Sequence, residues 1–454
     1  MKNSVKVILI IISVIGSYFV YRYLTKPQSP FKKYASLIPG TYRLGFTNLD
    51  SELSDIKLPV QGTIPHWLSG SLLRNGPAKF TTGSSWVADW FDGLAMIHAF
   101  KINNGTVSYT NKFLKTNDYK TVQKTGKMNY AGFMQDPCGS VFKNIFCWFK
   151  TGEVEHVSGM PNANVNIVNY SDHFAALTEI PLPIEFDPQT LETLGVIDYA
   201  DNLAKEDIHD TAHPHYDPET KEHLGYFTQF GRMSTVNVFS IADGGTARRI
   251  IGSYEVEEPS YMHSFAITPQ YAILTALPLV VNPLELLSGK AFINCFTWKP
   301  ELGTQLVVVD RKKGTVHKFK TEPFFAFHTI NAYEKGNTII LDIINYPDSS
   351  GLAQATFDDI LAPTHAKKDI TSGHAHRYTI DLISGTINSE ILSPEYLELP
   401  RINYAYNGKD YTYVYAFAES DTQEHPYVAD KLVKLNVKTG EIIQWQKPHC
   451  FPGE

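Results

Sequence analysis

The sequence predicts an all-β fold, and three observations point to it. Short alternating strands separated by turns rich in Asp, Asn and Gly recur along the chain, helical periodicity is nearly absent, and aromatic residues make up 13% of the 454 residues. A sandwich, a barrel or a propeller would each satisfy this pattern. A single core of this length favours the propeller, because a propeller grows by adding blades.

The predicted hairpins follow from the chemistry of their turns. Asn, Asp and Gly tolerate the positive φ angles that tight turns demand, so each such turn should join two antiparallel strands. The repeat is too degenerate to fix the number of blades. The clearest hairpins cover residues 100–112, 307–319, 378–391 and 432–445, and further ones are expected near 187–195, 217–225 and 243–245.

Composition excludes several classes of protein. The formal net charge is -7 and no long basic run occurs, which excludes a nucleic-acid-binding surface. The four cysteines show no CxxC spacing and are too sparse for a disulfide framework or a thiolate zinc site. The apolar fraction of 43% allows a packed core, and the many aromatic residues would also suit an apolar ligand tunnel.

The first 35 residues differ from the rest of the chain. Val7 to Tyr21 is an apolar run without charge, bounded by Lys6 and Arg22. At ~1.5 Å per residue it spans ~22 Å, less than a ~30 Å hydrocarbon core, although the flanking cations can extend it. A cleaved signal peptide is the alternative, but no A-x-A site follows. We therefore expect residues 1–35 to be a membrane anchor and linker, residues 36–454 to be one domain, and the cations after the run to favour a cytoplasmic body.

Three histidines lie far apart in strand-like apolar contexts. His213, His263 and His328 are separated by 50 and 65 residues, close to the length of one blade or a little more. Imidazoles at the inner ends of separate blades would converge on the propeller axis. Neutral imidazole suits Fe(II), and an all-nitrogen site with open positions can bind O2. From the residues alone, three core histidines bonded to backbone groups remain the alternative.

Five short motifs follow one another along the chain: GSLLRNGP (Gly70–Pro77), WFDGLAMIH (Trp90–His98), TAHPH (Thr211–His215), MHSF (Met262–Phe265) and FFAFHTINAYE (Phe324–Glu334). Their order and spacing resemble the carotenoid cleavage oxygenase family, which includes carotene-cleaving oxygenases and the isomerohydrolase of the retinal pigment epithelium. The resemblance runs from about Thr41 to Glu454, and the motifs QDPC and KLNVKTGE place it nearer the animal branch.

The resemblance implies a seven-bladed β-propeller with Fe(II) on its axis, held by four histidines. His213, His263 and His328 match the first three ligands. Carboxylates that orient the ligands match Glu179, Glu398 and Glu454, and we expect Glu179 to bond His263 and Glu398 to bond His328. Such an acceptor on the far ring nitrogen fixes the tautomer and raises the basicity of the imidazole.

The sequence also departs from the family pattern. The family's fourth histidine lies beyond the residue that matches Glu454, where this sequence stops, so we expect an incomplete last blade and weak iron binding. Three interpretations are open. The sequence is a fragment of a longer product, the protein is an inactive truncated relative, or another group such as His449 replaces the fourth ligand. A smaller departure is Asp89, where many relatives carry a histidine.

The resemblance implies an apolar substrate that enters from a membrane. The segment Phe142–Phe149 interleaves aromatic residues with Lys and resembles the family's membrane-dipping tunnel mouth, although a buried helical turn would fit the residues equally well. A second apolar stretch, Pro278–Phe292, matches a family region near the cavity.

The expected activity is Fe(II)-dependent cleavage by O2 of one C=C bond in a carotenoid or apocarotenoid, which gives aldehyde or ketone products. Iron would supply the oxygen chemistry, so no side chain need act as an acid or base. Isomerohydrolase chemistry on a retinyl ester and non-catalytic polyene binding are the alternatives. A propeller hydrolase is not supported, because the sequence shows neither a GxSxG motif nor a carboxylate pair that would indicate one.

Overall fold

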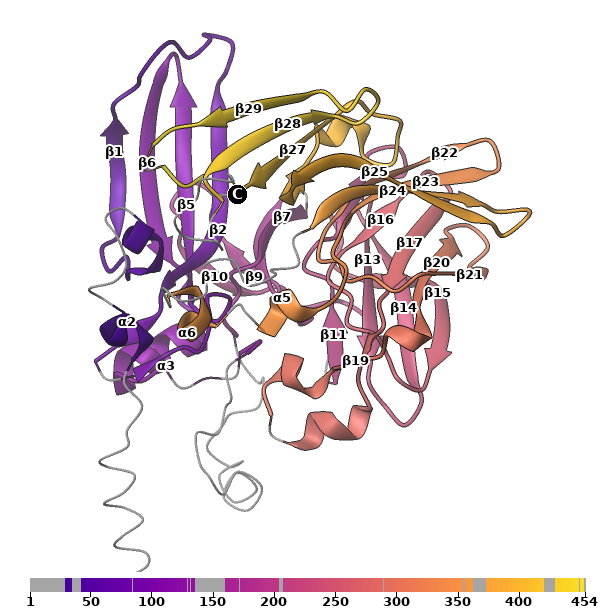
Figure 1. Ribbon diagram of the computed structural model, residues 1–454. Coiled ribbons are helices and arrows are strands. Elements are labelled where there is room, and N and C mark those ends of the chain that lie inside the picture. The colour runs from indigo at the N-terminus through magenta and orange to yellow at the C-terminus, as the bar shows by residue number, and fades with distance from the viewer. Residues whose placement is uncertain are drawn as a thin grey trace, which may run out of the picture.

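The structure is a computed structural model of an all-β propeller (Figure 1). It describes residues 29–34, 42–83, 85–128, 130, 132–134, 160–170, 172–203, 207–288, 290–353, 356–361, 373–419, 429–448 and 450–452. Six antiparallel sheets follow one another along the described chain. Five of them have four strands, and the third has five because a short extra strand, β12, pairs with β13.

The first three sheets are built from the N-terminal half of the domain. In spatial order, the strands of the first sheet are β1 (Leu53–Leu58), β6 (Thr106–Phe113), β5 (Leu94–Asn103) and β2 (Gly70–Lys79). Those of the second are β10 (Thr193–Val196), β9 (Ile184–Phe186), β8 (His173–Leu177) and β7 (Asn166–Tyr170). Those of the third are β11 (Ile208–Asp210), β13 (Glu222–Gln229), β14 (Ser234–Ala242) and β15 (Arg248–Val256), with β12 (His215–Asp217) beside β13.

In the last three sheets the strands lie side by side in chain order. These sheets contain β16 (Phe265–Ile267), β17 (Tyr271–Ala276), β20 (Thr304–Asp310) and β21 (Val316–Thr321); β22 (Thr329–Lys335), β23 (Thr338–Asn345), β24 (His374–Asp381) and β25 (Ile387–Tyr396); and β26 (Glu398–Arg401), β27 (Tyr413–Ala418), β28 (Lys431–Asn436) and β29 (Ile442–Gln446). Between β17 and β20 the chain leaves the fourth sheet to form a short separate ribbon.

The remaining described elements are short. Two ribbons pair β3 (Thr81–Thr82) with β4 (Ser85–Trp86) and β18 (Leu279–Val280) with β19 (Thr297–Trp298). The α-helices are α2 (Pro30–Lys33), α3 (Asn117–Thr125), α5 (Ser350–Ala353) and α6 (Phe357–Ile360). The 3-10 helices are η1 (Tyr42–Phe46), η2 (Pro283–Ser288), η3 (Phe292–Cys295), η4 (Pro300–Leu302) and η6 (Tyr404–Tyr406).

The four clearest predicted hairpins are confirmed: they are the pairs β5–β6, β20–β21, β24–β25 and β28–β29. Their turns use the expected left-handed backbone, with φ of 43° at Asn104 and 76° at Gly105 in the first and 69° at Gly314 in the second. Local turn chemistry therefore sets the register of these strands.

Inward-facing amides tie the sheets together around the ring. Asn75 of β2 donates from Nδ2 to the carbonyl of Ala163, beside the second sheet, at 2.9 Å. Asn166 of β7 donates in the same way to the carbonyl of Ala212, in the third sheet's inner segment, at 2.9 Å. Such bonds satisfy backbone groups that no strand partner reaches, so they fix the inner strands relative to one another.

The same arrangement continues through the later sheets. Thr329 of β22 donates from Oγ1 to the carbonyl of Phe265 in β16 at 2.6 Å. Asn331, also in β22, donates to the carbonyls of Tyr406 and Lys409, which precede β27, at 3.1 and 3.0 Å. The inner strands next to the candidate ligands are thus held by side chains as well as by the sheets.

The last sheet returns to the first. β29 lies beside the first sheet in Figure 1, and Lys447 donates to Gln61 Oε1 at 3.3 Å. All described strands belong to six sheets and two ribbons. The seventh blade that the family resemblance implies is therefore not found among the described residues.

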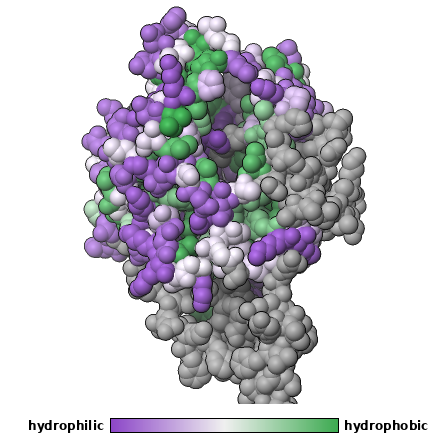
Figure 2. Space-filling view, turned by 90° about the vertical axis from the view of Figure 1, so that its left-hand side faces the viewer, coloured by the Kyte–Doolittle hydropathy of each residue, from purple (hydrophilic) through white to green (hydrophobic). Residues whose placement is uncertain are grey.

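Apolar side chains remain exposed on both of these sheets. Leu72 of the first sheet is 55% exposed, and Ile443 and Trp445 of the last are 58% and 50% exposed. The side of the molecule that carries the first sheet faces the viewer in Figure 2, where apolar residues flank a recess. Exposed apolar surface of this kind is typical of surfaces that another segment or partner covers.

The expected anchor, residues 7–21, lies outside the described residues. Among the described residues, no helix has the length and apolarity needed to cross a membrane. Within the expected linker, α2 packs on the domain: the ring centroid of Phe31 lies 4.6 Å from that of Phe357 in α6.

Candidate metal centre

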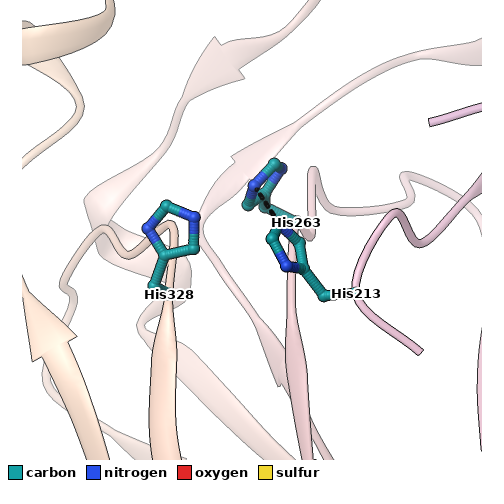
Figure 3. Close-up of side chains that lie close together, drawn as sticks. All are labelled: His213, His263 and His328. Carbon is teal, nitrogen blue, oxygen red and sulfur yellow. Dashed lines mark hydrogen bonds between the residues drawn. The ribbon is translucent and has the colours of Figure 1, made fainter. Parts of the chain in front are cut away.

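The three candidate histidines converge on one point (Figure 3). One ligand atom from each lies within 4.8 Å of the others, and the Nε2 atoms of His213 and His263 are 2.8 Å apart. His213 lies between β11 and β12, His263 shortly precedes β16, and His328 directly precedes β22. The prediction that these three side chains meet is therefore confirmed.

Hydroxyl groups next to the histidines hold the three segments together. The Thr211 hydroxyl donates to the carbonyl of His263 at 3.2 Å and accepts from the amide of His213 at 3.1 Å. The Ser264 hydroxyl donates to the carbonyl of Phe327 at 2.7 Å. The bonds to His263 and Phe327 join one histidine segment to the next, and the bond from the His213 amide fixes the first segment on the same hydroxyl, so the imidazoles start from fixed backbone positions.

Two carboxylates fix the ring orientation of two histidines, as the family resemblance implied. Glu179 lies 2.5 Å from His263 Nδ1, and Glu398 lies 2.6 Å from His328 Nδ1. A carboxylate accepts only, so Nδ1 of each ring carries the proton and donates it. This tautomer, inferred from the bond, leaves the Nε2 lone pairs of His263 and His328 available to a metal.

Sequence reasoning missed three further side chains that hold these carboxylates. Tyr261 donates to Glu179 at 2.8 Å, and His209 Nε2 lies 3.3 Å from the second oxygen of Glu179. Tyr346 donates to Glu398 at 2.6 Å. Tyr261 and His209 each stand only a few residues before a predicted ligand, which was the available signal. Tyr346 lies in the loop that follows β23 and is found only through the fold.

The protonation states suit metal binding. Burial, with smaller effects from His263 and His328, holds the pKa of His213 well below its ordinary value, and burial also lowers the pKa of His263. Burial alone would raise the pKa of Glu179, but His209 and His263 outweigh it and lower that pKa. At neutral pH the imidazoles of His213 and His263 are neutral, as metal ligands must be, and Glu179 is ionised.

Glu398 is held by an unusual backbone. Its neighbour Leu399 has a φ of 50°, in the left-handed region that non-glycine residues rarely adopt, and the Leu399 amide donates to Glu398 Oε2 at 2.6 Å. Such a conformation costs on the order of 1–3 kcal/mol and persists where the surroundings impose it. In this protein it turns a backbone donor onto the carboxylate that orients His328.

Aromatic residues cover one side of the three histidines. The Phe327 ring lies 5.6 Å from that of His263 and 6.4 Å from that of Phe91. Phe133 continues this surface, at 5.8 Å from Phe91 and 5.7 Å from Tyr261. We call Phe91, Phe133, Tyr261 and Phe327 the aromatic wall. It gives the candidate centre an apolar side that suits an apolar ligand.

The other side is polar. Residues that follow each histidine, such as His215 and Thr329, line a small hollow together with Arg401 and Asn407. His215 belongs to this side and is not a fourth ligand: its Nε2 donates to the carbonyl of Phe265 at 2.8 Å.

Some expected residues lie outside the described residues: Glu454, His449 and the segment Phe142–Phe149. The apolar stretch Pro278–Phe292 is described apart from residue 289, and one part of it is buried while another is exposed. Val281 is fully buried, whereas Leu284 and Leu287 of η2 are 73% and 82% exposed.

Comparison with known proteins agrees with this geometry. The family model described as "Retinal pigment epithelial membrane protein" matches residues 46–454. The chain belongs to the carotenoid cleavage oxygenase family. Members of this family that it resembles include the beta,beta-carotene 15,15'-dioxygenase of Gallus gallus, 32% identical over 90% of this chain and 85% of the relative. The carotenoid isomerooxygenase of Galleria mellonella is 31% identical over 88% of this chain and 82% of the relative.

Solved structures of the same family share the fold. A mutant of the Synechocystis apocarotenoid oxygenase superposes with a TM-score of 0.78 at 27% identity, over 94% of this chain and 85% of that one. The cobalt-substituted form of the same oxygenase gives a TM-score of 0.78 at 27% identity, over 91% of this chain and 84% of that one.

Proposed function

We propose that this protein is an Fe(II)-dependent dioxygenase that cleaves one C=C bond of a carotenoid or apocarotenoid with O2 and gives two carbonyl products. The observation that carries the proposal is the convergence of His213, His263 and His328, with the far nitrogens of two of them held by carboxylates. The names of the similar oxygenases support the class of substrate.

The residues present fit an iron ion. Imidazole nitrogens bound to one first-row metal at roughly 2.0–2.1 Å lie no more than ~4.2 Å apart, and the three ligand atoms of this site already lie within 4.8 Å of one another. All three donors are neutral nitrogens, which suit Fe(II) and leave further coordination positions open.

Iron bound at this site would supply the activation of O2. The protein's own residues do the rest. Glu179 and Glu398 keep the ligand nitrogens pointed at the centre, as required for a rigid metal site. The aromatic wall receives the polyene chain and excludes water from it, so that binding decides which double bond faces the metal. Attachment to a membrane through residues 7–21 and Phe142–Phe149 belongs to the same proposal, because an apolar substrate would reside there.

The decisive experiment compares products with and without O2. Iron-loaded protein incubated in air with a carotenoid or apocarotenoid should yield two carbonyl fragments, and the same mixture under argon should yield none. The H263A variant should yield none in either case. Anaerobic release of an isomerised retinol from a retinyl ester would instead support the isomerohydrolase alternative. Stoichiometric polyene binding without product in air would support the non-catalytic one.

A further inference from the structure

Two carboxyl groups lie buried side by side behind the aromatic wall. Asp89 is 0% exposed and Asp92 is 3% exposed. The Asp92 amide donates to Asp89 Oδ1 at 3.2 Å, and the side chain of Asp89 reaches hydrogen-bonding range of the Asp92 side chain. None of the ion pairs found among the described residues includes either carboxyl.

Asp92 organises the segment that carries Phe133. Its Oδ1 accepts from the Phe133 amide at 2.6 Å and its Oδ2 from the Met134 amide at 3.0 Å, while its carbonyl accepts from the Tyr130 hydroxyl. Gly132 packs so closely that a Cβ there would lie 2.1 Å from Asp92 Oδ1. Both carboxylate oxygens of Asp92 therefore act as acceptors, and they fix the backbone that places Phe133 in the aromatic wall.

As an anion, Asp89 would lack the hydrogen-bond donors that the Asp92 carboxylate has. Asp89 Oδ2 is fully buried, and among the described residues no donor faces it. An ionised Asp89 would leave that oxygen unsatisfied and would repel the neighbouring carboxylate. A protonated Asp89 removes both problems, because its O–H donates to Asp92.

We propose that Asp89 is a carboxylic acid at neutral pH and that it donates its proton to Asp92, so that the pair acts as a positioning device for Gly132–Met134 and hence for the aromatic wall. This proposal goes beyond the proposed function, since it needs neither metal nor substrate.

The surroundings of the pair are consistent with this assignment. Burial, followed by the charge of Asp92, raises the pKa of Asp89 to about 10. Tyr130 and, beyond it, Asp118 are titratable groups close to the pair, and burial with the nearby Asp92, Asp118 and Asp89 keeps the pKa of Tyr130 well above its ordinary value. Thr356, which pairs with Asp89 in a β-bridge, leads into α6, and this helix adds the carboxyl groups of Asp358 and Asp359. These neighbours supply no positive charge that would favour ionisation of Asp89.

The proposal fixes the sign of a pH effect. An unfolded Asp titrates at about 3.9, so between that pH and about 10 the folded chain keeps a proton that the unfolded chain releases. Raising the pH through this window therefore destabilises the fold, by up to about tenfold per pH unit in the unfolding equilibrium constant. D89N carries a permanent donor and lacks this proton, so its melting temperature should exceed that of the wild type by a margin that grows from pH 5 to pH 9.

The direct test is infrared spectroscopy of the protein at neutral pH. The difference spectrum between wild type and D89N should contain the carbonyl stretch of a protonated carboxylic acid, shifted in D2O. D201N is the matched control: Asp201 is also a largely buried carboxyl, but Arg248 donates to it at 2.9 and 3.0 Å, so its loss should remove only a carboxylate band.

Hydrogen exchange tests the positioning role. Exchange of the Phe133 and Met134 amides should stay slow in D89N and become fast in D89A, which has no donor. Absence of an acid band in the wild type, its persistence in D89N, or a melting-temperature margin that does not change with pH would each overturn the proposal. If D89N does not fold, the wild type alone provides the test. Its infrared acid band should disappear when the pH is raised above ~10.

Discussion

At the scale of single residues, the proposed metal site depends on histidines whose Nδ1 is hydrogen-bonded to a carboxylate, which leaves Nε2 for a metal. His328 donates from Nδ1 to Glu398, and Glu398 is held in turn by Tyr346 and by the Leu399 amide. Sequence reasoning found the pair His328–Glu398 through the resemblance. It could not find Tyr346, because nothing local to a tyrosine in a loop shows which carboxylate it will meet. The Asp89–Asp92 pair was missed for the same reason: Asp89 stood out only as a departure from the family pattern.

The first prediction concerns Glu398. E398Q keeps the shape of the side chain but weakens its bond to His328, so Fe(II) affinity should fall by about 10–100-fold, the usual effect of losing such a partner. Anaerobic titration against a competing chelator measures it. E285Q, which changes an exposed carboxylate paired with Lys290, is the control and should bind as the wild type does. Equal affinity in E398Q would show that the carboxylate does not orient the ligand.

At the scale of elements, hairpins were the best-predicted part of the fold. Their turns are decided by residues such as Gly314 and Gly385, whose positive φ angles are a local property. The short inner strands, by comparison, were not predicted from the sequence. β16 and β26 are only three and four residues long, and they are strands because neighbouring strands pair with them and not because of their own pattern.

Two glycines in hairpin turns, both with a left-handed backbone, allow a matched test of this account. Gly314 and Gly336 have φ of 69° and 63°, but a Cβ at Gly314 would lie 2.5 Å from the Ile251 carbonyl, whereas at Gly336 it would meet nothing within 4 Å. G336A should therefore cost about 1–2 kcal/mol for the left-handed backbone alone. G314A should cost about 1–3 kcal/mol more, because the turn must also move away from the adjacent sheet. Denaturant unfolding measures both, and equal losses would contradict the close approach.

At the scale of the whole molecule, sheets that are distant in sequence are joined by buried polar side chains as well as by apolar packing. Asn331 is the clearest case: it is 3% exposed, donates to two carbonyls, and accepts from the Gly408 amide at 3.0 Å. The propeller class could be predicted because many hairpins in one long domain leave few alternatives. The seven-blade count rested on the resemblance alone, and the described residues form six sheets.

N331L tests the importance of these joints. The leucine fills similar volume but leaves three backbone groups, one buried and two partly buried, without their partners, each costing about 1–3 kcal/mol. We expect a loss of at least about 3 kcal/mol, together with weaker iron binding, because β22 follows His328 directly. N103L, which changes a turn residue at the exposed end of β5, is the control. A melting temperature of N331L within a degree or two of that of N103L would refute the role.

The central claim is that His213, His263 and His328 together hold the metal. Anaerobic titration of the purified protein with Fe(II), followed by elemental analysis after gel filtration, tests it most directly. The wild type should saturate at about one iron per chain, and a variant with all three histidines changed to alanine, shown to be folded by its circular dichroism spectrum, should retain less than about a tenth of that. A folded triple variant that still carries one iron per chain would contradict the account.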